Sequence, residues 1–143
     1  MIGADVIEET ISFLLAQICK AHRNAANTAL QGLELHVGQE MVLFQLTQED
    51  GQTQTQLAER MCIEAPTLTR MLQRMERDEI IRRLADSDDA RVSRVYLTDH
   101  ARALQPRIEE CWAGLEQQTL AGFSQEERLL LRRLLMQIRS NLD

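Results

Sequence analysis

Residues 66–77, with the sequence PTLTRMLQRMER, decide how the rest of the chain is interpreted. Successive residues of an α-helix are rotated by about 100°, so apolar residues three and four apart share one face. This spacing predicts a helix that packs by an apolar stripe, formed by Leu68, Met71, Leu72 and Met75. The opposite face and its flanks carry mostly polar side chains: Pro66, Thr69, Arg70, Gln73, Arg74 and Arg77. A solvated amphipathic helix would show the same pattern, so the neighbouring segments must decide.

The segment before this helix predicts a shorter helix joined to it by a tight turn. Thr53 and Gln56 have the spacing of a capping box, in which the threonine caps the helix and the glutamine bonds back. A turn over residues 62–64 leads to Pro66, which fits a first helical turn because its missing N–H is not needed there. These features match a helix-turn-helix, whose second helix can offer arginine and glutamine to phosphates and base edges. Two-helix turns also occur as plain packing units.

The segment after this helix predicts a β-hairpin. Residues 80–85 and 92–98 contain several β-branched residues, and the Asp and Ser residues between them favour a turn. The hairpin would form a wing with Arg91 near its tip, where an arginine can enter a narrow minor groove. Asp89 lies two residues away and can hold Arg91 by a charge-assisted hydrogen bond. The alternative is an ordinary surface hairpin with a self-neutralising pair of charges.

Further amphipathic helices are predicted on both sides of residues 53–98. The periodicity places them at residues 5 to about 30, 38–48, 98 to about 122, and from 124 onward. Gly32 is expected to stop the first of these helices, and Pro106 to kink or break the third. The last helix carries leucine over well more than one face. That much leucine exceeds what a small domain leaves uncovered, so it predicts an oligomer seam.

Length and composition predict one domain with an aliphatic core, because the 143 residues are 44% hydrophobic and only 3% aromatic. The formal net charge of −6 is unusual for a nucleic-acid binder. However, residues 66–94 hold seven arginines against six acids, and phosphate binding needs only a locally positive surface. The sequence has no basic N-terminal region and no long apolar run, which predicts a soluble, cytoplasmic protein without a membrane segment.

The cysteines predict neither a disulfide framework nor a metal centre. Cys19, Cys62 and Cys111 are an odd number, as expected of reduced thiols in a cytosolic protein. Cys19 and His22 have helical spacing for two metal ligands, but no second pair completes a site. Cys19 is therefore expected to be a buried thiol. The sequence lacks a phosphate-binding glycine loop, a nucleophile elbow and a zinc-protease motif, so no enzyme, cofactor or metal is expected.

The order of these elements resembles the MarR family of bacterial winged-helix regulators over nearly the whole chain. The most specific part is the run PTLTRMLQRMERDEIIRRLADSDDARVSRVYLT, which is similar to that family's recognition helix and wing. The resemblance implies a mainly α fold with a small β-hairpin. Within the single domain, residues 33–98 would form the DNA-binding winged helix, and residues 1–32 and 99–143 the dimerisation helices. It also implies a homodimer that places two recognition helices in successive major grooves of double-stranded DNA.

The resemblance assigns roles to individual residues. The implied DNA contacts are Thr53, Gln54, Pro66, Thr67, Thr69, Arg70, Arg74 and, in the minor groove, Arg91; the outward position of Gln73 adds that residue. Dimerisation contacts are predicted for apolar residues of the terminal helices: Ile7, Ile11, Leu130, Leu134 and Ile138. The chain departs from the family pattern at Cys62, where glycine is common, at Glu64, where Ser or Asp would cap the helix, and at Ala90, which is often arginine.

Three functional hypotheses follow. The first is a dimeric repressor that reads a pseudo-palindromic operator and is released by a small, phenolic-type effector. The second is a winged-helix module that binds protein, which the acidic balance favours. The third is a thiol-based redox sensor that uses Cys19, Cys62 or Cys111. In the hydroperoxide-sensing branch of the family, the reactive cysteine aligns with Ser12, two helical turns from Cys19, which argues against that route.

Overall fold

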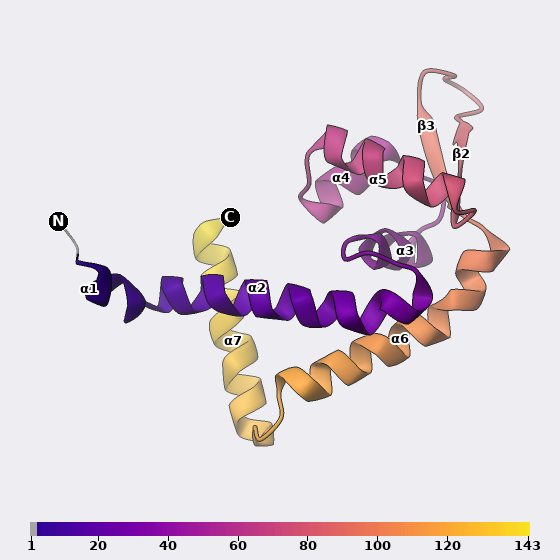
Figure 1. Cartoon of the computed structure of the whole chain (residues 1–143). Helices are drawn as coiled ribbons and strands as arrows, with labels where there is room; N and C mark the ends of the chain where they lie inside the picture. Colours follow the sequence, from indigo (N-terminus) through magenta and orange to yellow (C-terminus); the bar gives the residue numbers. More distant parts are fainter. Residues whose placement is uncertain (1–2) are drawn as a thin grey trace.

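The computed structural model describes residues 3–143 and shows a mainly α chain with one small antiparallel sheet (Figure 1). The elements follow in the order α1 (Ala4–Glu8), α2 (Ile11–Leu30), a 3₁₀ turn η1 (Gln31–Leu33), α3 (Gln39–Gln48), β1 (Gln52–Thr53), α4 (Gln54–Met61), α5 (Ala65–Arg77), β2 (Ile81–Ala85), β3 (Ser93–Leu97), α6 (Asp99–Thr119) and α7 (Gln125–Leu142). The predicted fold class is confirmed. The first two residues of the predicted N-terminal dimerisation segment lie outside the described residues.

The sheet has three strands in the order β1-β3-β2. β2 and β3 form the predicted hairpin, in a register that pairs Ile81 with Leu97. β1 was not predicted, because two residues that pair with a distant strand leave no periodic signal in the sequence. Gly51 precedes β1 with φ +74°, and a Cβ atom there would lie 2.8 Å from the Tyr96 ring. Both the backbone conformation and the close ring therefore require glycine at this turn.

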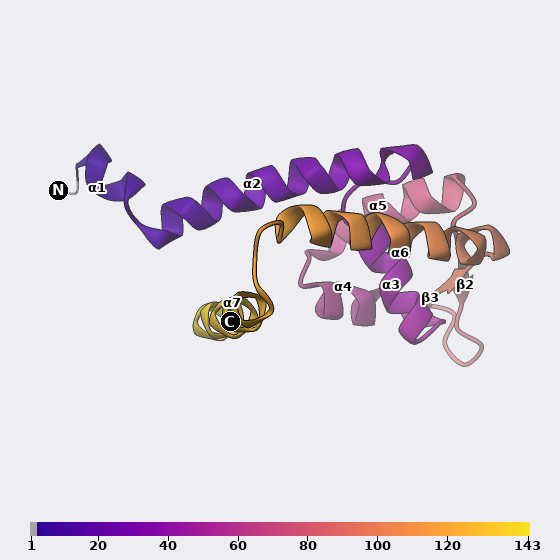
Figure 2. The same cartoon turned by 90° about the horizontal axis from the view of Figure 1, so that it is seen from below.

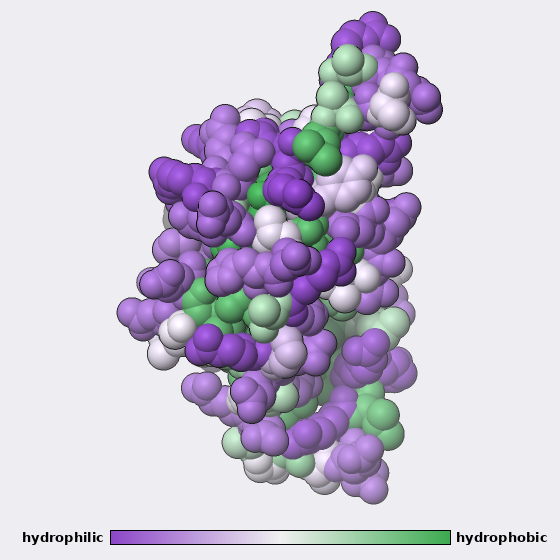
Figure 3. All heavy atoms as spheres, turned by 90° about the vertical axis from the view of Figure 1, so that its right-hand side faces the viewer, coloured by the Kyte–Doolittle hydropathy of each residue, from purple (hydrophilic) through white to green (hydrophobic). Residues whose placement is uncertain are grey.

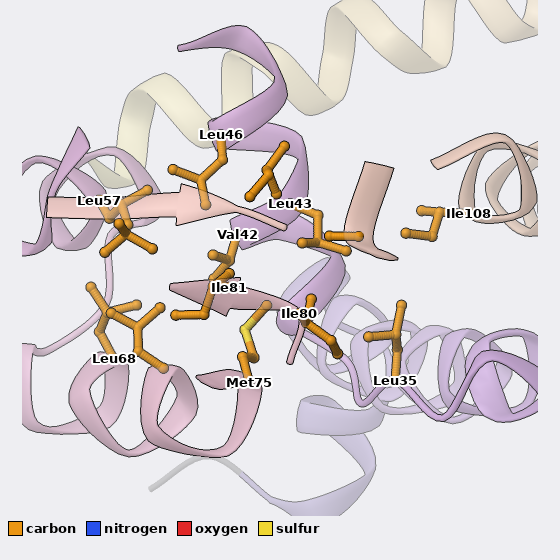
Figure 4. Close-up of a cluster of buried hydrophobic side chains, with 14 of the residues drawn as sticks. Leu35, Val42, Leu43, Leu46, Leu57, Leu68, Met75, Ile80, Ile81 and Ile108 are labelled. Carbon is orange, nitrogen blue, oxygen red and sulfur yellow. The ribbon is translucent and has the colours of Figure 1, made fainter. Parts of the chain in front are cut away.

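One hydrophobic core joins the sheet to α3, α4, α5 and the facing parts of α2 and α6 (Figure 4). As the low aromatic content predicts, its most deeply buried side chains are aliphatic or Met: Leu30, Val42, Leu43, Leu46, Leu57, Leu68, Leu72, Met75, Ile81 and Val95. The predicted apolar stripe of α5 supplies Leu68, Leu72 and Met75, and Met71 packs at its edge. Most of the core thus comes from residues 33–98, which are termed the body below.

α2 and α6 lie side by side below the body, whereas α1, the first half of α2 and α7 project away from it (Figures 1 and 2). These projecting parts, residues 4–20 and 125–142, are termed the arms. No residue of α7 is buried, although its predicted capping box between Ser124 and Glu127 is formed. Most of the large exposed apolar side chains lie on the arms: Val6, Ile7, Ile11, Leu14, Ile18, Leu129, Leu130, Leu134, Leu135, Met136 and Leu142.

Two sequence expectations about the helices were wrong, and of the two outcomes expected at Pro106, a kink or a break, the break does not occur. The first helix is divided into α1 and α2, because Thr10 caps α2 by accepting the Phe13 N–H at 3.1 Å. Gly32 does not stop that helix but lies within η1, which ends at Glu34 in the left-handed region with φ 57°. Pro106 does not break α6, which runs from Asp99 to Thr119 with the proline on its exposed side.

Candidate nucleic-acid interface

α4 and α5 form the predicted helix-turn-helix, and local hydrogen bonds explain its geometry. At the start of α4, Thr53 Oγ1 accepts the Gln56 N–H at 3.1 Å, and the Thr53 N–H donates to Gln56 Oε1 at 2.9 Å. Cys62 ends α4 in the left-handed region with φ 53°, which explains why glycine is favoured there. Glu64 is the N-cap of α5, but its side chain accepts no hydrogen bond from the first N–H groups of that helix.

The outward face of α5 presents most of the residues predicted to contact DNA. Exposed side chains on it include Pro66, Thr67, Arg70, Gln73 and Arg74, while Thr69 is half-buried. Arg70 and Arg74 form no ion pair with any of the described residues. Their guanidinium groups therefore keep their donors available for a phosphate or a base edge. Thr67, Arg70 and Arg74 also border a hollow of about 280 Å³ beside His36.

The wing carries the predicted Asp89–Arg91 pair and projects from a largely hydrophilic surface (Figure 3). Arg91 Nε donates to Asp89 Oδ1 at 3.0 Å, and Nη2 donates to Oδ2 at 3.1 Å. These bonds, with the Arg91 N–H, hold the pKa of the Asp89 carboxyl below its ordinary value. The Arg91 side chain is still 89% exposed. The wing tip thus offers a charged group whose direction is set in advance.

Arg94 forms a second ion pair within the wing and also joins the wing to the segment that precedes β1. Arg94 Nε donates to Asp86 Oδ1 at 2.6 Å, and Arg94 Nη1 donates to the Gly51 carbonyl at 2.8 Å. Asp86 also accepts the N–H groups of Asp88 and Asp89 through Oδ2. The bond from Arg94, followed by those two N–H groups, holds the pKa of Asp86 below its ordinary value. Arg94 is thus a structural member of the wing.

Gln54 is half-buried and takes part in contacts that sequence reasoning missed. Its Nε2 donates to Thr69 Oγ1 at 3.4 Å, and its Oε1 accepts from Arg83 Nη1 at 3.5 Å. Arg83 of β2 also pairs with Glu76 of α5 at 3.0 Å, and this hydrogen bond is the main cause that lowers the pKa of Glu76. Gln54 and Arg83 are 29 positions apart, so no local spacing could have indicated the contact.

Ion pairing explains how an acidic chain can present a cationic face. Four of the six acids within residues 66–94 pair with arginines of the same segment: Glu76, Asp78, Asp86 and Asp89. Of the seven arginines, three are left without such a partner, and Arg70 and Arg74 are the two on the outward face of α5. Two of the three arginines without such a partner therefore lie on the outward face of α5, which makes that face locally positive.

The residues predicted for dimerisation all lie on the arms. Ile7, Ile11, Leu130 and Leu134 are exposed by 43–65%, and Ile138 is half-buried. Among the described residues, the hydrophobic core contains no residue of these arms. The contacts themselves remain a prediction.

The expectation that Cys19 is buried was wrong. It is exposed and lies in the first half of α2. Cys62 is also exposed, whereas Cys111 is partly buried and donates from Sγ to the Ala29 carbonyl at 3.1 Å. In the part of the chain that the structure describes, no three His, Cys, Asp or Glu side chains gather as metal ligands would. No helix of that part is long and apolar enough to cross a membrane.

A helix-turn-helix followed by a β2–β3 wing defines a winged helix-turn-helix protein. The model of the MarR family matches residues 35–93, from just before α3 to the start of β3. Solved structures with the same fold span nearly the whole chain. Together, these comparisons show that the chain has the winged-helix fold and that residues 35–93 are similar to the MarR family.

Three relatives illustrate the likeness. The uncharacterized HTH-type transcriptional regulator YybA of Bacillus subtilis (strain 168) is 23% identical over 129 residues, which cover 90% of this chain and 86% of YybA. The S. aureus MepR–DNA complex gives a TM-score of 0.85 at 26% identity, covering 94% of this chain and 98% of MepR. Bordetella bronchiseptica BpsR, whose DNA binding is regulated by 6-hydroxynicotinic acid, gives 0.85 at 21% identity, covering 92% and 94%. The likeness to BpsR bears on the fold alone.

Proposed function

We propose that this chain is a homodimeric, sequence-specific DNA-binding regulator of transcription that acts as a repressor. The observation that carries the proposal is the outward face of α5, where Arg70 and Arg74 are exposed and have no ion-pair partner among the described residues. An α-helix fits the major groove of B-DNA, in which arginine can bind the O6 and N7 atoms of guanine. The likeness to MepR, a protein solved with DNA, supports the same use of the fold here.

In this proposal the wing and α4 add contacts on either side of α5. Arg91 enters the minor groove, where narrow A·T-rich segments concentrate negative potential. Thr53 and Gln54 lie at the N-terminus of α4, whose backbone N–H groups favour a phosphate oxygen. Phosphate contacts of this kind fix the register of the protein on the duplex, while Thr67, Thr69 and the other outward side chains of α5 read base edges.

Two copies would associate through the arms. The exposed apolar stripes of α1, α2 and α7 are too large to leave in water and are not covered by any of the described residues. A two-fold dimer would bury them and present two α5 helices, so each protomer would read one half of a pseudo-palindrome. The centres of the two half-sites would lie about 34–36 Å apart, which is one turn of DNA.

A small-molecule effector is the further part of the proposal. A hollow of about 490 Å³ lies where the end of α2 meets the body, lined by Asn27, Thr28, Gln31, Glu34, Leu35 and His36. Its volume falls in the range of about 300–1,000 Å³ that small-molecule sites occupy. A phenolic acid bound there would touch both regions and change the spacing of the two α5 helices. It can release DNA only by its differential affinity for the two spacings.

The experiment that tests the proposal is binding of the purified protein to the DNA upstream of its own gene, against random DNA of equal length, across a salt series. We expect a preference for the upstream DNA and an affinity that falls steeply with salt, because bound phosphates release counterions. A folded dimer without any preference at low salt would contradict the proposal and favour a winged-helix module that binds protein. Repeating the measurement with phenolic acids tests the effector, and an unchanged affinity would contradict that part.

A further inference from the structure

Arg83 lies at the centre of a polar cluster that joins the wing to both helices of the helix-turn-helix. It reaches Glu76 of α5 through two side-chain bonds, from Nη2 to Oε1 at 3.0 Å and from Nε to Oε2 at 3.4 Å. The backbone N–H of Arg83 donates to the same carboxylate at 3.3 Å. Arg83 Nη1 donates to Gln54 Oε1 at 3.5 Å, and Gln54 Nε2 donates to Thr69 Oγ1 at 3.4 Å. These four residues are termed the wing–helix cluster.

The donors and acceptors of this cluster are mutually consistent. Thr69 gives its only hydroxyl hydrogen to the Ala65 carbonyl at 2.9 Å, so it can only accept from Gln54. Gln54 then uses its oxygen for Arg83 and one of its two amide hydrogens for Thr69. One Gln54 hydrogen is left for a phosphate, while Thr69 retains a lone pair and a methyl group for a base edge. The cluster therefore directs two residues of the proposed interface.

Arg83 itself is poorly placed to be a phosphate ligand. Its side chain is 24% exposed, against 89% for Arg91. Its charge is opposed by Glu76 through a two-point contact, a geometry that the flat guanidinium fork holds more rigidly than an ammonium group could. Its low exposure separates Arg83 from Arg91, which is also paired with an acid but remains exposed. Arg83 therefore has a geometric role, because it links an element proposed for the minor groove to one proposed for the major groove.

We propose that Arg83 is a positioning residue for DNA recognition, which fixes the wing relative to α5 so that Arg91 and Arg70 reach their two grooves in one docking geometry. This inference rests on the proposed function. It predicts that loss of the cluster weakens sequence-specific binding, in which both elements must fit at once. Binding to random DNA depends on the total phosphate attraction and should change little.

The test compares Arg83→Met, Arg83→Lys, Glu76→Gln and the Arg83→Met/Glu76→Gln double variant. The matched control is Arg82→Met, which removes the same charge from the exposed neighbour on β2. We expect Arg83→Met and Glu76→Gln each to weaken binding to the upstream duplex by about tenfold, near the lower cost of one mismatched base pair. The loss of affinity in the double variant should not exceed the larger of the two single-variant losses, because both substitutions break the same contact. The affinity for random DNA and the salt dependence of binding should not change.

Arg83→Lys separates positioning from simple charge. Lysine keeps the positive charge but lacks the fork that spans Glu76 and Gln54, so most of the tenfold loss should remain. Near-normal binding by Arg83→Lys, or an equal loss on both DNAs with a shallower salt dependence, would overturn the inference and make Arg83 a phosphate contact. A tenfold loss in Arg82→Met would also overturn it.

A measurement without DNA keeps this inference distinct from the proposed function. Amide hydrogen exchange of β2 and β3 should be faster in Arg83→Met than in Arg82→Met, with both variants folded as judged by thermal unfolding. Equal exchange in the two variants would overturn the coupling. If the unmodified protein shows no preference for the upstream duplex, the proposed function fails, while the exchange comparison still decides whether Arg83 couples wing and helix.

Discussion

The body and the arms are built from similar leucine-rich amphipathic helices, yet they differ in what those helices bury. In the body, Leu43, Leu57 and Leu72 are at most 1% exposed. On the arms, Leu129 and Leu142 are 63% and 80% exposed. Capping does not explain the contrast, because α4 of the body and α7 of the arms both begin with a complete capping box. The difference lies in what each apolar stripe meets.

This contrast indicates that the two regions are stabilised in different ways. The body buries its stripes against one another, so its free energy of unfolding should not depend on protein concentration. In the proposed dimer the arms bury theirs against a second copy, so their stability should follow mass action. The proposed DNA-reading surface lies on the body. The proposed spacing between the two such surfaces of a dimer is set by the arms.

The largest expected effect is on the arms. Leu134→Glu should raise the dimer dissociation constant by at least about a hundredfold, because a two-fold interface loses two leucines, each worth about 1.5–3 kcal/mol when buried. Sedimentation equilibrium measures this constant. Ser140→Glu adds the same charge to another exposed position of α7 and is the control. An unchanged constant for Leu134→Glu would mean that α7 is not in the interface.

In the body, Leu72→Ala should lower the free energy of unfolding by about 2–5 kcal/mol, because it removes a fully buried side chain and leaves a cavity. Urea unfolding at several protein concentrations measures the change. The loss in Leu72→Ala should be the same at every concentration, whereas the loss in Leu134→Ala should vary with concentration. If both losses varied alike, the body would not be a folding unit of its own.

Two strained residues offer a smaller effect that is confined to the body. Glu79 and Cys62 have φ of 59° and 53°, each at the end of a helix where glycine is favoured. Glu79→Gly and Cys62→Gly should each raise the free energy of unfolding by about 1 kcal/mol, since the left-handed conformation costs a residue with a Cβ atom about 1–2 kcal/mol. Thermal unfolding measures the gain. A loss on both substitutions would show that the side chains contribute more than the strain costs.

Acid should weaken the hydrogen bonds that hold the wing. At Glu40 in α3 it should instead favour the folded state. The pKa of Asp86 is lower in the folded state than the ordinary value of about 3.9, so its stabilising bonds are complete above that pH and are lost as pH falls through the lowered pKa. Burial raises the pKa of Glu40 in α3, so its protonation below that raised pKa favours folding. Amide exchange of the wing should therefore accelerate below about pH 4. Asp86→Asn should reduce this pH dependence to the part that Asp89 contributes through its bonds to Arg91, and an undiminished dependence would contradict the assignment.

Features that depend on residues close together in the chain could be predicted from the sequence. The capping boxes, the turn at Cys62, the hairpin and the Asp89–Arg91 pair each depend on residues a few positions apart, so spacing and side-chain chemistry suffice to define them. The apolar stripe of α5 was predicted for the same reason. The helix-turn-helix and the wing therefore follow from local rules.

Features that depend on distant residues could not be predicted. The pairing of β1 with β3 and the contact of Arg83 with Gln54 join segments whose order in space no spacing reveals. The burial of Cys19 was mispredicted because burial depends on what packs against α2, and none of the residues in its first half is buried among the described residues. The break before α2 was missed because an apolar stripe continues through Thr10, which acts as a cap.

The most direct test of the central claim is the effect of Arg70→Ala on binding to the upstream duplex and to random DNA. The account places Arg70 on the reading face of α5. We therefore expect a loss of about 1–3 kcal/mol, or roughly 5- to 150-fold, on the upstream duplex and a much smaller loss on random DNA. An equal loss on both DNAs, or no loss on either, would contradict the claim that this face reads sequence.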